Sequence, residues 1–233
     1  MRRRVQKAFE QRDWSVGGKW PVSGRGSTLE NTERLRRALP GIFERYGVTT
    51  FVDAPCGDWY WMQHVDLSGI TYIGADISSN IVEANREAHA APNRTFLHLD
   101  ITSDPLPQGD LFLCRDCLFH LKTWLRWEFF RNFARSGNRY LLTTVVQTPE
   151  NRNLRNNAKF AAFNPMLPPY SFPDPLEIIP ETADDLTLEQ MQETKEGYRH
   201  RASYLWSHEQ VEGVVAAHDA ASGESTGDRD GED

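Results

Sequence analysis

Hydrophobic residues along the chain gather into short runs that alternate with longer segments carrying one apolar stripe. The short runs predict strands at residues 49–53, 71–76, 94–100, 110–114 and 139–146. The segments between them with helical spacing are 59–65, 78–90 and 123–137. Strands that alternate with helices are joined by crossover connections, so the pattern predicts an α/β fold with a mostly parallel sheet.

Further elements flank this alternating region. A capping box at residues 27–30 and a stop at Gly47 bound a helix before the first strand. After the fifth strand follow an Asn- and Pro-rich loop at 149–175, strands at 176–181 and 203–206, and a helix at 207–217. We therefore expect a doubly wound, mostly parallel, seven-stranded sheet with helices on both faces.

The chain divides into three expected parts. Residues 1–27 hold a short polar helix and a loop rich in Gly, Ser and Trp, and we expect them to form a lid or cofactor cover. Residues 28–217 form the α/β domain. Residues 218–233 are acidic and of low complexity, which predicts a disordered tail.

Composition narrows the class of protein. The 233 residues suit one domain with a sizeable core, and the formal net charge of −7 argues against nucleic-acid binding by the overall field. No apolar run approaches the ~18 residues that span a bilayer, and the N-terminus lacks the apolar core of a secretory signal. Three cysteines imply no disulfide framework. We expect a cytoplasmic protein with neither a membrane nor a nucleic-acid partner.

Acidic residues follow four successive predicted strands. Asp53, Asp76 and Asp100 end the first three strands, and Asp116 lies just beyond the fourth. In an open parallel sheet the carboxyl ends of the strands form the edge where ligands bind. Each Asp taken alone is as well explained as a helix cap or turn former. The series of four favours a ligand site.

The turn after the first strand bears on the identity of the ligand. It reads D-A-P-C-G-D-W, whereas a dinucleotide turn needs G-x-G-x-x-G so that backbone N–H groups close on phosphate. Pro55 lacks an N–H and Asp58 repels phosphate, which argues against NAD and ATP. Asp76 follows Asp53 at roughly the 20-residue spacing expected of an acid that binds a ribose diol. A cofactor with a ribose, an adenine and a cationic centre fits these residues.

These residues resemble the motifs of class I S-adenosylmethionine-dependent methyltransferases, which have a Rossmann-like fold. The four matching stretches are DAPCGDW (53–59), YIGADI (72–77), LHLDI (97–101) and DLFLCRD (110–116). The resemblance extends over roughly residues 28–146. Pro55 and Trp59 replace the first and third glycines of the first motif. That departure implies that the methionine end of the cofactor is held in an unusual way.

The resemblance implies a set of cofactor-binding residues. These are Asp53, Ala54, Gly57, Asp76, Ile77, Asp100, Ile101 and Arg115. In the family's pattern the first three shape the turn around the methionyl group, and Asp76 binds the ribose hydroxyls. Ile77 packs on the adenine, Asp100 accepts from its amino group, and the backbone of Ile101 reads the ring edge. Arg115 or Arg25 pairs with the cofactor carboxylate or with an anionic acceptor.

Candidate acceptor chemistry follows the fourth strand. His120 lies one helical turn after Asp116, so a general base oriented by a carboxylate is one interpretation, and an interior histidine is the other. Cys114, Cys117 and His120 have metal-ligand spacing, but structural cysteines are favoured and no metal is expected. Trp20, Trp59 and Arg25 are candidate acceptor-binding residues; core packing is the alternative for the tryptophans.

The sequence thus predicts a methyltransferase that uses S-adenosylmethionine and acts on a small molecule, with an anionic acceptor among the options. Transfer to an oxygen, of a hydroxyl or a carboxylate, is the leading expectation. N-methylation of a small amine and a non-catalytic cofactor-binding partner subunit are the alternatives.

Overall fold

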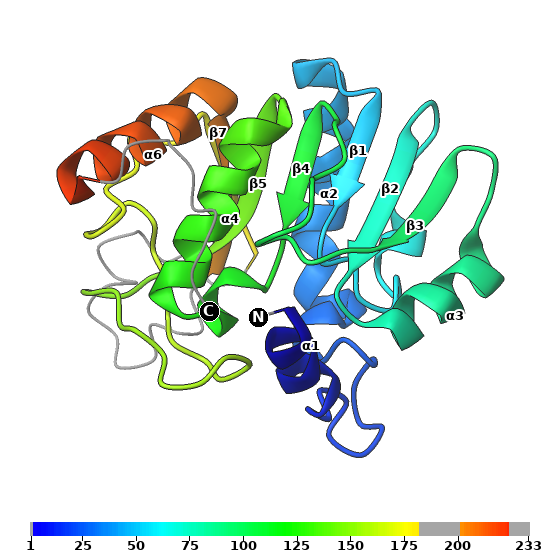
Figure 1. The fold of residues 1–233 in the computed structure, drawn as a ribbon. Helices are drawn as coiled ribbons and strands as arrows, with labels where there is room; N and C mark the ends of the chain where they lie inside the picture. Colours follow the sequence, from blue (N-terminus) through cyan, green and yellow to red (C-terminus); the bar gives the residue numbers. More distant parts are fainter. Residues whose placement is uncertain (1, 182–200, 224–233) are drawn as a thin grey trace.

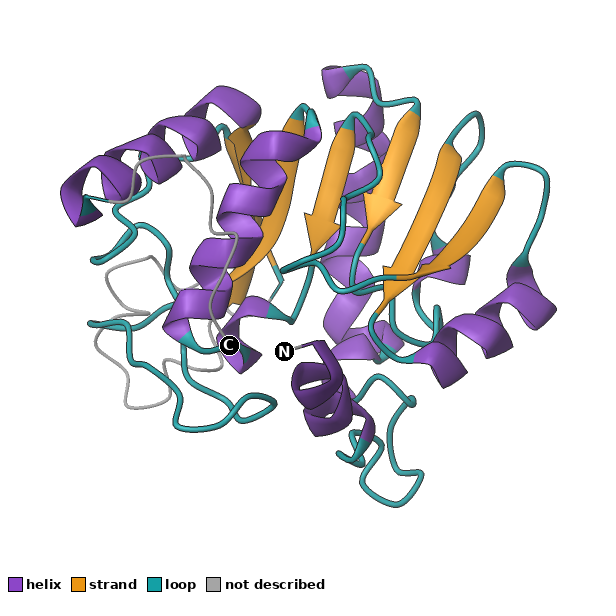
Figure 2. Ribbon diagram, viewed as in Figure 1, coloured by secondary structure: helices purple, strands orange, loops and turns teal. Residues whose placement is uncertain are grey.

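The computed structural model describes residues 2–181 and 201–223, which contain one seven-stranded sheet in the order β3-β2-β1-β4-β5-β7-β6 (Figures 1 and 2). The strands are β1 (Thr50–Asp53), β2 (Thr71–Asp76), β3 (Arg94–His98), β4 (Leu111–Cys114), β5 (Tyr140–Val146), β6 (Glu177–Pro180) and β7 (Arg201–Ser207). The first five strands are parallel, and β7 pairs antiparallel with β5 and β6. The predicted doubly wound, mostly parallel sheet is confirmed.

Helices cover both faces of this sheet. They are α1 (Arg2–Glu10), α2 (Leu29–Tyr46), α3 (Ser79–His89), α4 (Thr123–Ser136) and α6 (His208–Ser222). Buried residues of α2 and α3 pack on one face, and those of α4 and α6 pack on the other. The helix α1 lies instead below the carboxyl ends of the strands (Figure 1). Within the described ranges, no helix combines the length and apolarity needed to cross a membrane.

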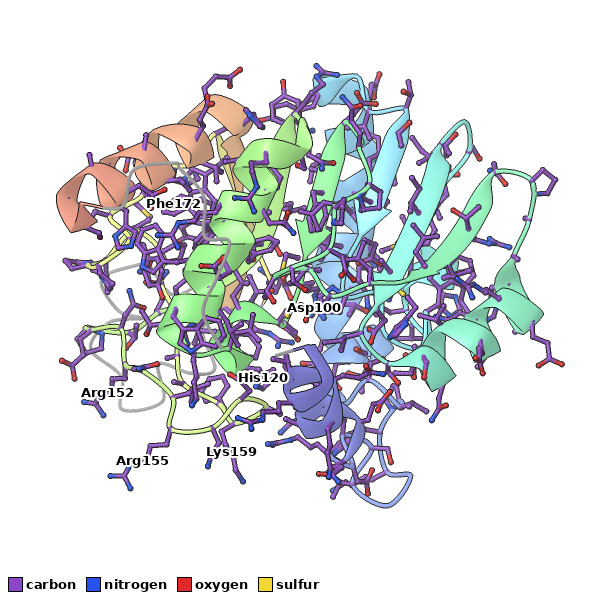
Figure 3. All side chains as sticks on the ribbon, in the orientation of Figure 1. Asp100, His120, Arg152, Arg155, Lys159 and Phe172 are labelled. Atoms are coloured by element: carbon purple, nitrogen blue, oxygen red, sulfur yellow. The ribbon has the colours of Figure 1, made fainter. Side chains whose placement is uncertain are left out.

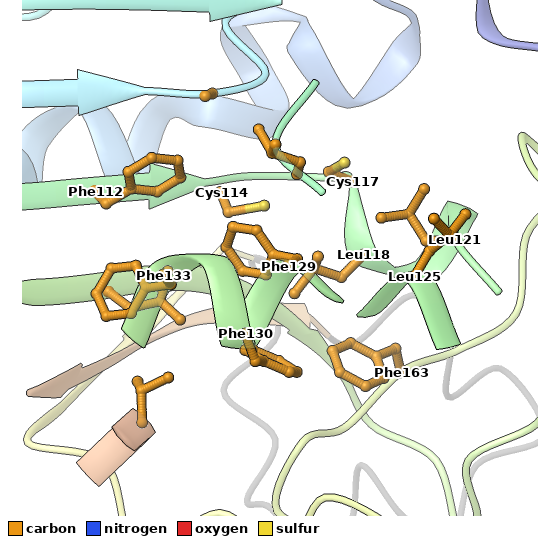
Figure 4. Packing of buried hydrophobic residues seen from close by; sticks show 14 of the residues in the cluster. Phe112, Cys114, Cys117, Leu118, Leu121, Leu125, Phe129, Phe130, Phe133 and Phe163 are labelled. Carbon is orange, nitrogen blue, oxygen red and sulfur yellow. The ribbon is translucent and has the colours of Figure 1, made fainter. Parts of the chain in front are cut away.

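Strand β4 is apolar at every position because both of its faces are covered. Phe112 and Cys114 belong to the core on the α4 side, while Leu111 and Leu113 belong to the core on the α2 side. All four are fully buried, because a central strand of a parallel sheet has both faces covered. Figure 4 shows Phe112 beside Phe129 and Phe133 of α4; a centroid distance of 5.9 Å separates Phe112 from Phe129.

Two local predictions near the start of the domain need correction. The predicted helix at 59–65 is wrong: only a 3-10 turn, η2 (Met62–His64), forms there. Trp59 has a φ of 54°, which a right-handed helix does not allow. The capping box is also wrong in detail, since Thr28 is the N-cap and accepts from the Asn31 N–H. The predicted stop at Gly47 is confirmed by its left-handed φ of 59°.

The C-terminal boundary of the domain was also predicted too early. Helix α6 continues through Ser222 and ends at Gly223, so residues 218–222 are helical and not a disordered tail. His218 stacks on Trp127 of α4 at a centroid distance of 3.6 Å. Asp219 accepts a hydrogen bond of 2.7 Å from Arg131 Nη2. These contacts with α4 explain why the helix extends. The rest of the predicted tail, residues 224–233, lies outside the described residues.

Candidate active site

A cavity of about 730 Å³ lies at the carboxyl edge of the sheet. Its walls come from the loops that follow β1, β2, β3 and β4, from Arg201 at the start of β7, and from the N-terminal segment, residues 2–27. Figure 1 shows α1 and the loop after it at this edge. The volume lies in the range of pockets that bind small molecules, about 300–1,000 Å³.

Asp76 ties two of these loops together at the cavity wall. Its Oδ2 accepts from the Gly57 N–H at 3.1 Å, and its Oδ1 accepts from the Ser78 N–H at 2.9 Å. Burial raises the pKa of Asp76, while these backbone hydrogen bonds act in the opposite direction. Each carboxylate oxygen keeps a second lone pair, so the group can also accept from a pair of hydroxyls.

The loop after β3 provides a mixed apolar and acidic wall. Leu99, Asp100, Ile101 and Ile77 all line the cavity. Asp100 Oδ1 accepts from the backbone and the hydroxyl of Thr102, at 2.9 and 2.7 Å, which fixes the orientation of the carboxylate. Figure 3 shows Asp100 at the strand ends, near the centre of the molecule. The structure therefore brings together Asp76, Ile77, Asp100 and Ile101, as predicted.

Asp53 and Ala54 do not line the cavity but lie behind its wall. Asp53 is 2% exposed and accepts a hydrogen bond of 2.7 Å from the Tyr72 hydroxyl. Burial raises the pKa of Asp53 to about 7, and Tyr72 and Arg115 act in the opposite direction. The Ala54 N–H donates to the Leu113 carbonyl at 2.9 Å. Both residues can shape the turn, as the resemblance implied, while Pro55, Cys56 and Gly57 face the cavity.

A charged network joins the residues that follow β4 to the end of β6 and the start of β7. Arg115 donates through Nε and Nη2 to Glu181, at 3.1 and 2.7 Å, and its Nη1 lies 3.2 Å from Asp116 Oδ2. Arg201 Nη1 donates to the same Asp116 oxygen at 2.8 Å. Burial alone would raise the pKa of Asp116, but Arg115 and Arg201 hold it below its ordinary value. Asp116 keeps a φ of 51° within this network.

This network changes the expectation for Arg115. Arg115 lines the cavity, but all three of its guanidinium nitrogens contact carboxylates of this chain, so its charge is already balanced within the protein. Arg25 is the other residue predicted to pair with the cofactor carboxylate. It lines the cavity, is exposed, and forms no ion pair within the described part of the chain; its guanidinium lies 5.5 Å from the Trp20 ring. The sequence analysis did not identify Glu181 and Arg201, because they come near Asp116 only when β6 and β7 join the sheet beside β5.

His120 lines the cavity, but its hydrogen-bond partner differs from the prediction. Its Nδ1 bonds to the Lys159 carbonyl at 2.7 Å, whereas the Asp116 carboxylate bonds to Arg201 and Thr144. The predicted orientation of His120 by Asp116 is therefore wrong. The 3-10 turn η3 (Leu118–His120) replaces the α-helical turn that would have paired them. Burial lowers the pKa of His120 to about 4, so the neutral ring carries an acceptor lone pair on Nε2.

The N-terminal segment is docked closely on two loops of the sheet edge. The Asp58 N–H donates to Ser23 Oγ at 3.2 Å, and the Ser23 N–H donates to Asp58 Oδ2 at 3.3 Å. A Cβ added to Gly57, which has a φ of 55°, would lie 2.7 Å from the Ser23 side chain. A Cβ added to Gly26 would lie 2.2 Å from Asp116 Oδ2. Glycine is required at both contacts because no side chain fits there.

The tryptophans differ in whether they reach the cavity. Trp14, Trp20 and Trp61 line the cavity. Trp59 does not, so its predicted role in acceptor binding is wrong: it is 4% exposed and packs on Tyr72 and Phe96. The positive φ of Trp59 accompanies this inward placement. Nothing in the sequence separates Trp59 from Trp61, since both follow the same turn.

Two arginines of the Asn- and Pro-rich loop lie apart from the cavity, and the two cysteines considered as metal ligands belong to the core. Arg152 and Arg155 are exposed on the loop after β5, and Figure 3 shows them pointing away from the protein; Arg152 pairs with Glu150 at 2.6 Å. Cys114 and Cys117 are buried free thiols of the core. Among the residues that the structure describes, no group of three or more His, Cys, Asp or Glu side chains could hold a metal.

Comparisons with known proteins identify the fold. Neither a family model nor a curated protein matches this chain. A SAM-dependent methyltransferase of the DUF858 family from Leishmania major matches with a TM-score of 0.61 at 11% identity, over 88% of this chain and 82% of that chain. Two other structures match at a TM-score of 0.52. Magnesium protoporphyrin IX methyltransferase from Synechocystis with bound SAM matches at 12% identity, over 88% and 96% of the two chains. The N-methyltransferase NodS from Bradyrhizobium japonicum matches at 9% identity, over 78% and 98%.

Other matches extend over a smaller part of the chain: this chain spans 56% of the length of a Pyrococcus horikoshii protein and of the SAH-bound form of the same Synechocystis enzyme. The longer matches cover 78–88% of this chain and have low identity, so they establish the architecture alone. The chain has the Rossmann-like fold of class I SAM-dependent methyltransferases.

Proposed function

We propose that this protein is a SAM-dependent methyltransferase that transfers a methyl group to an oxygen atom of a small molecule. The observation that carries the proposal is the placement of Asp76 and Asp100. They line one cavity at the carboxyl ends of β2 and β3, with Ile77, Leu99 and Ile101 beside them. One carboxylate suits a ribose diol, the other suits an adenine amino group, and the apolar side chains suit the faces of the ring.

The residues present fit S-adenosylmethionine at each of its parts. The Asp76 carboxylate is held by the Gly57 and Ser78 N–H groups and would accept from the ribose hydroxyls. Asp100, held by Thr102, would accept from the adenine. Arg25 is the cation available to the methionyl carboxylate, since Arg115 is paired with Glu181 and Asp116. The Pro55-containing turn has no phosphate-binding N–H array, which favours this cofactor over a dinucleotide.

The bound cofactor would supply an electrophilic methyl group and leave as a neutral thioether. The protein has to position the acceptor and receive a proton where the acceptor carries one. His120 is the group on the cavity wall suited to receive it, because Nδ1 is bonded to the Lys159 carbonyl and Nε2 retains a lone pair. The N-terminal segment, docked through Ser23 and Gly26, would exclude water from the reacting groups.

An oxygen acceptor is favoured over an amine by the charges at this end of the cavity. Arg12 lines it beside the Trp14 ring, and Asp116, which follows β4, is already bonded to Arg201. An ammonium group would therefore find its candidate counter-ion occupied. Under this proposal, N-methylation remains the competing outcome of the test.

The test combines calorimetry with a transfer assay. S-adenosylmethionine should bind the purified protein, and NAD should not. The labelled cofactor is then incubated with pools of hydroxylated acids, phenols, sugars and amines. Label transferred to a hydroxyl or carboxylate pool supports the proposal. Label found only in the amine pool would replace it with N-methylation, and cofactor binding without transfer to any pool would support a non-catalytic partner subunit.

A further inference from the structure

One end of the cavity is lined by aromatic rings. Phe9, Trp14, Phe119, His120 and Phe160 all face it, and we refer to them as the aromatic wall. Within the wall, the Trp14 and His120 centroids are 4.7 Å apart, those of Phe119 and His120 are 4.5 Å apart, and those of Phe119 and Phe160 are 5.2 Å apart.

The wall is assembled from three parts of the chain that are distant in sequence. Phe9 and Trp14 come from the N-terminal segment, Phe119 and His120 from η3, and Phe160 from the loop after β5. The Ala158 N–H donates to the His120 carbonyl at 2.9 Å, and the Arg12 guanidinium donates to the Ala158 carbonyl, so all three parts are held together. Figure 3 shows His120 between α1 and the loop that bears Lys159.

Except for Phe119, which is 5% exposed, the rings of the aromatic wall are more exposed than ordinary core. Phe160 is 46% exposed, and Trp14 and His120 are half-buried, although all three line a cavity. Core aromatics of this protein such as Phe129 and Phe133 are fully buried. Rings that keep accessible faces at a cavity are available to pack on a ligand, and aromatic ligands gain most from such contacts.

The wall lies on the acceptor side of the cavity. Asp76 and Asp100, which fit the nucleoside, follow β2 and β3, on one side of β1 in the sheet. His120 follows β4, which lies on the other side of β1. A molecule packed on the wall would therefore approach the reacting centre from the side opposite the adenine.

The positive charge of Arg12 indicates which kind of ligand the aromatic wall binds. Aromatic cages also bind quaternary ammonium groups, but here the Arg12 guanidinium lies 4.3 Å from the centroid of the Trp14 ring. A second cation at the same ring would be repelled. A neutral or anionic aromatic molecule has no such penalty.

We propose that the acceptor is a phenol whose ring packs on Trp14 and Phe160 while its hydroxyl donates to His120 Nε2. This substrate class rests on the proposed function. In the transfer, the phenolic oxygen forms the bond to the methyl carbon as the bond from that carbon to sulfur breaks, with its electron pair left on sulfur. The phenolic proton passes to His120, so the products are an aryl methyl ether, the thioether and an imidazolium. The low basicity of the partly desolvated His120 ring also favours a phenol, with a pKa of ~10, over the much less acidic aliphatic hydroxyls.

The experiment compares two acceptors of similar size, para-hydroxybenzoate and its ring-saturated counterpart hydroxycyclohexanecarboxylate. Binding of each is measured by calorimetry in the presence of S-adenosylhomocysteine and again without it, and turnover is measured with labelled cofactor. We expect the parent protein to bind the aromatic compound more tightly by about twofold to tenfold, the range of a ring-packing contribution, and to methylate it at the hydroxyl.

Substitutions then test the aromatic wall. Phe160→Leu and Trp14→Leu keep apolar volume but remove the ring, and each should bring the affinity ratio of the two compounds toward one. Trp124→Leu is the matched control, because Trp124 is 41% exposed on α4 and does not line the cavity. If Trp14→Leu proves unstable, Phe160→Leu still tests the aromatic wall, because Phe160 is on the surface and its substitution should not affect folding.

The outcomes separate this inference from the proposed function. Equal binding of the two compounds by the parent, or an affinity ratio unchanged in Phe160→Leu, would overturn the inference of an aromatic acceptor. Cofactor binding with methyl transfer to the saturated hydroxyl would also overturn it, but would support the proposed methyltransferase function. Binding of para-hydroxybenzoate that depends on Phe160, in a protein that does not bind the cofactor, would support the aromatic site and refute the proposed function.

Discussion

The backbone N–H of Gly57 donates a hydrogen bond of 3.1 Å to Asp76 Oδ2, which joins the loop after β1 to the end of β2. One carboxylate thus fixes the loop geometry and faces the cavity. Both roles depend on the charge of Asp76, which predicts two effects when that charge is removed.

Asp76→Ala should weaken cofactor binding by about 100-fold. Two charge-assisted hydrogen bonds to ribose hydroxyls, each worth about 1.5–3 kcal/mol, would be lost. The Gly57 and Ser78 N–H groups also lose their acceptor, so the melting temperature should fall modestly. Calorimetric titration and a thermal melt measure the two effects. Asp66→Ala, at an exposed carboxylate, is the control. An unchanged dissociation constant in a folded Asp76→Ala variant would make Asp76 a structural cap only.

Gly26→Ala should displace the N-terminal segment from the sheet edge. The new Cβ would lie 2.2 Å from Asp116 Oδ2, so either the segment or the Asp116 carboxylate must move. We expect loss of turnover and faster proteolysis near residue 26, with the α/β domain still folded by circular dichroism. Gly213→Ala is the matched control: its Cβ meets nothing within 4 Å, and a helical Gly→Ala change should stabilise by about 0.5–1 kcal/mol. Equal activity of both variants would contradict the close docking.

Asp53 should make stability fall as the pH rises. Burial raises its pKa to about 7 in the folded protein, against about 3.9 in the unfolded chain, so the folded state binds more protons between these values. The free energy of unfolding should therefore decrease from about pH 4 to about pH 7, by up to about 4 kcal/mol from this group. Asp53→Asn has no such titration.

The measurement compares denaturant unfolding of Asp53→Asn and the parent at several pH values. The stability of the variant relative to the parent should increase from pH 4 to pH 8. A difference that stays constant across this range would show that Asp53 remains ionised in the folded protein, stabilised by Arg115.

Turnover should not depend on the titration of His120 near neutral pH. Because burial lowers its pKa to about 4, the ring is already unprotonated above about pH 5, whereas an ordinary histidine would titrate near 6.5. If Nε2 receives the proton, His120→Ala should reduce turnover by about 10²–10⁴ and leave cofactor affinity unchanged. The depressed pKa also means that the stability present above pH 6.5 is lost as the pH falls toward 4. A limb near pH 6.5 that vanishes in His120→Ala would show that the ring is solvated in the working enzyme.

The end of α6 should matter for stability, and the residues after it should not. Truncation after Ala217 removes the His218 ring from Trp127 and the Asp219 carboxylate from Arg131, so the melting temperature should fall. Truncation after Gly223 keeps both contacts, and the acidic, low-complexity residues that it removes are predicted to contribute neither stability nor turnover. Equal melting of the two truncated proteins would contradict a structural role for residues 218–222.

The sequence by itself determined the order of strands and helices and the edge that carries the site. Periodicity reports which side chains are buried, and in a parallel sheet the carboxyl ends of all strands meet at one edge. The pattern therefore places Asp76 and Asp100 at this edge, and the resemblance to the methyltransferase motifs adds Ile101; all three line the cavity. The stop at Gly47 was predictable for an equally local reason, the left-handed backbone that glycine allows.

Only the tertiary structure decided which partners these residues take. Arg115 is satisfied by Glu181, far along the chain, because β6 and β7 fold back beside β5. His120 turns to the Lys159 carbonyl, since a 3-10 turn follows β4 and a distant loop packs against it. Trp59 and Trp61 follow one turn and both belong to the core on the α2 side, yet only Trp61 also lines the cavity. Such choices depend on contacts between distant segments, which local patterns do not encode.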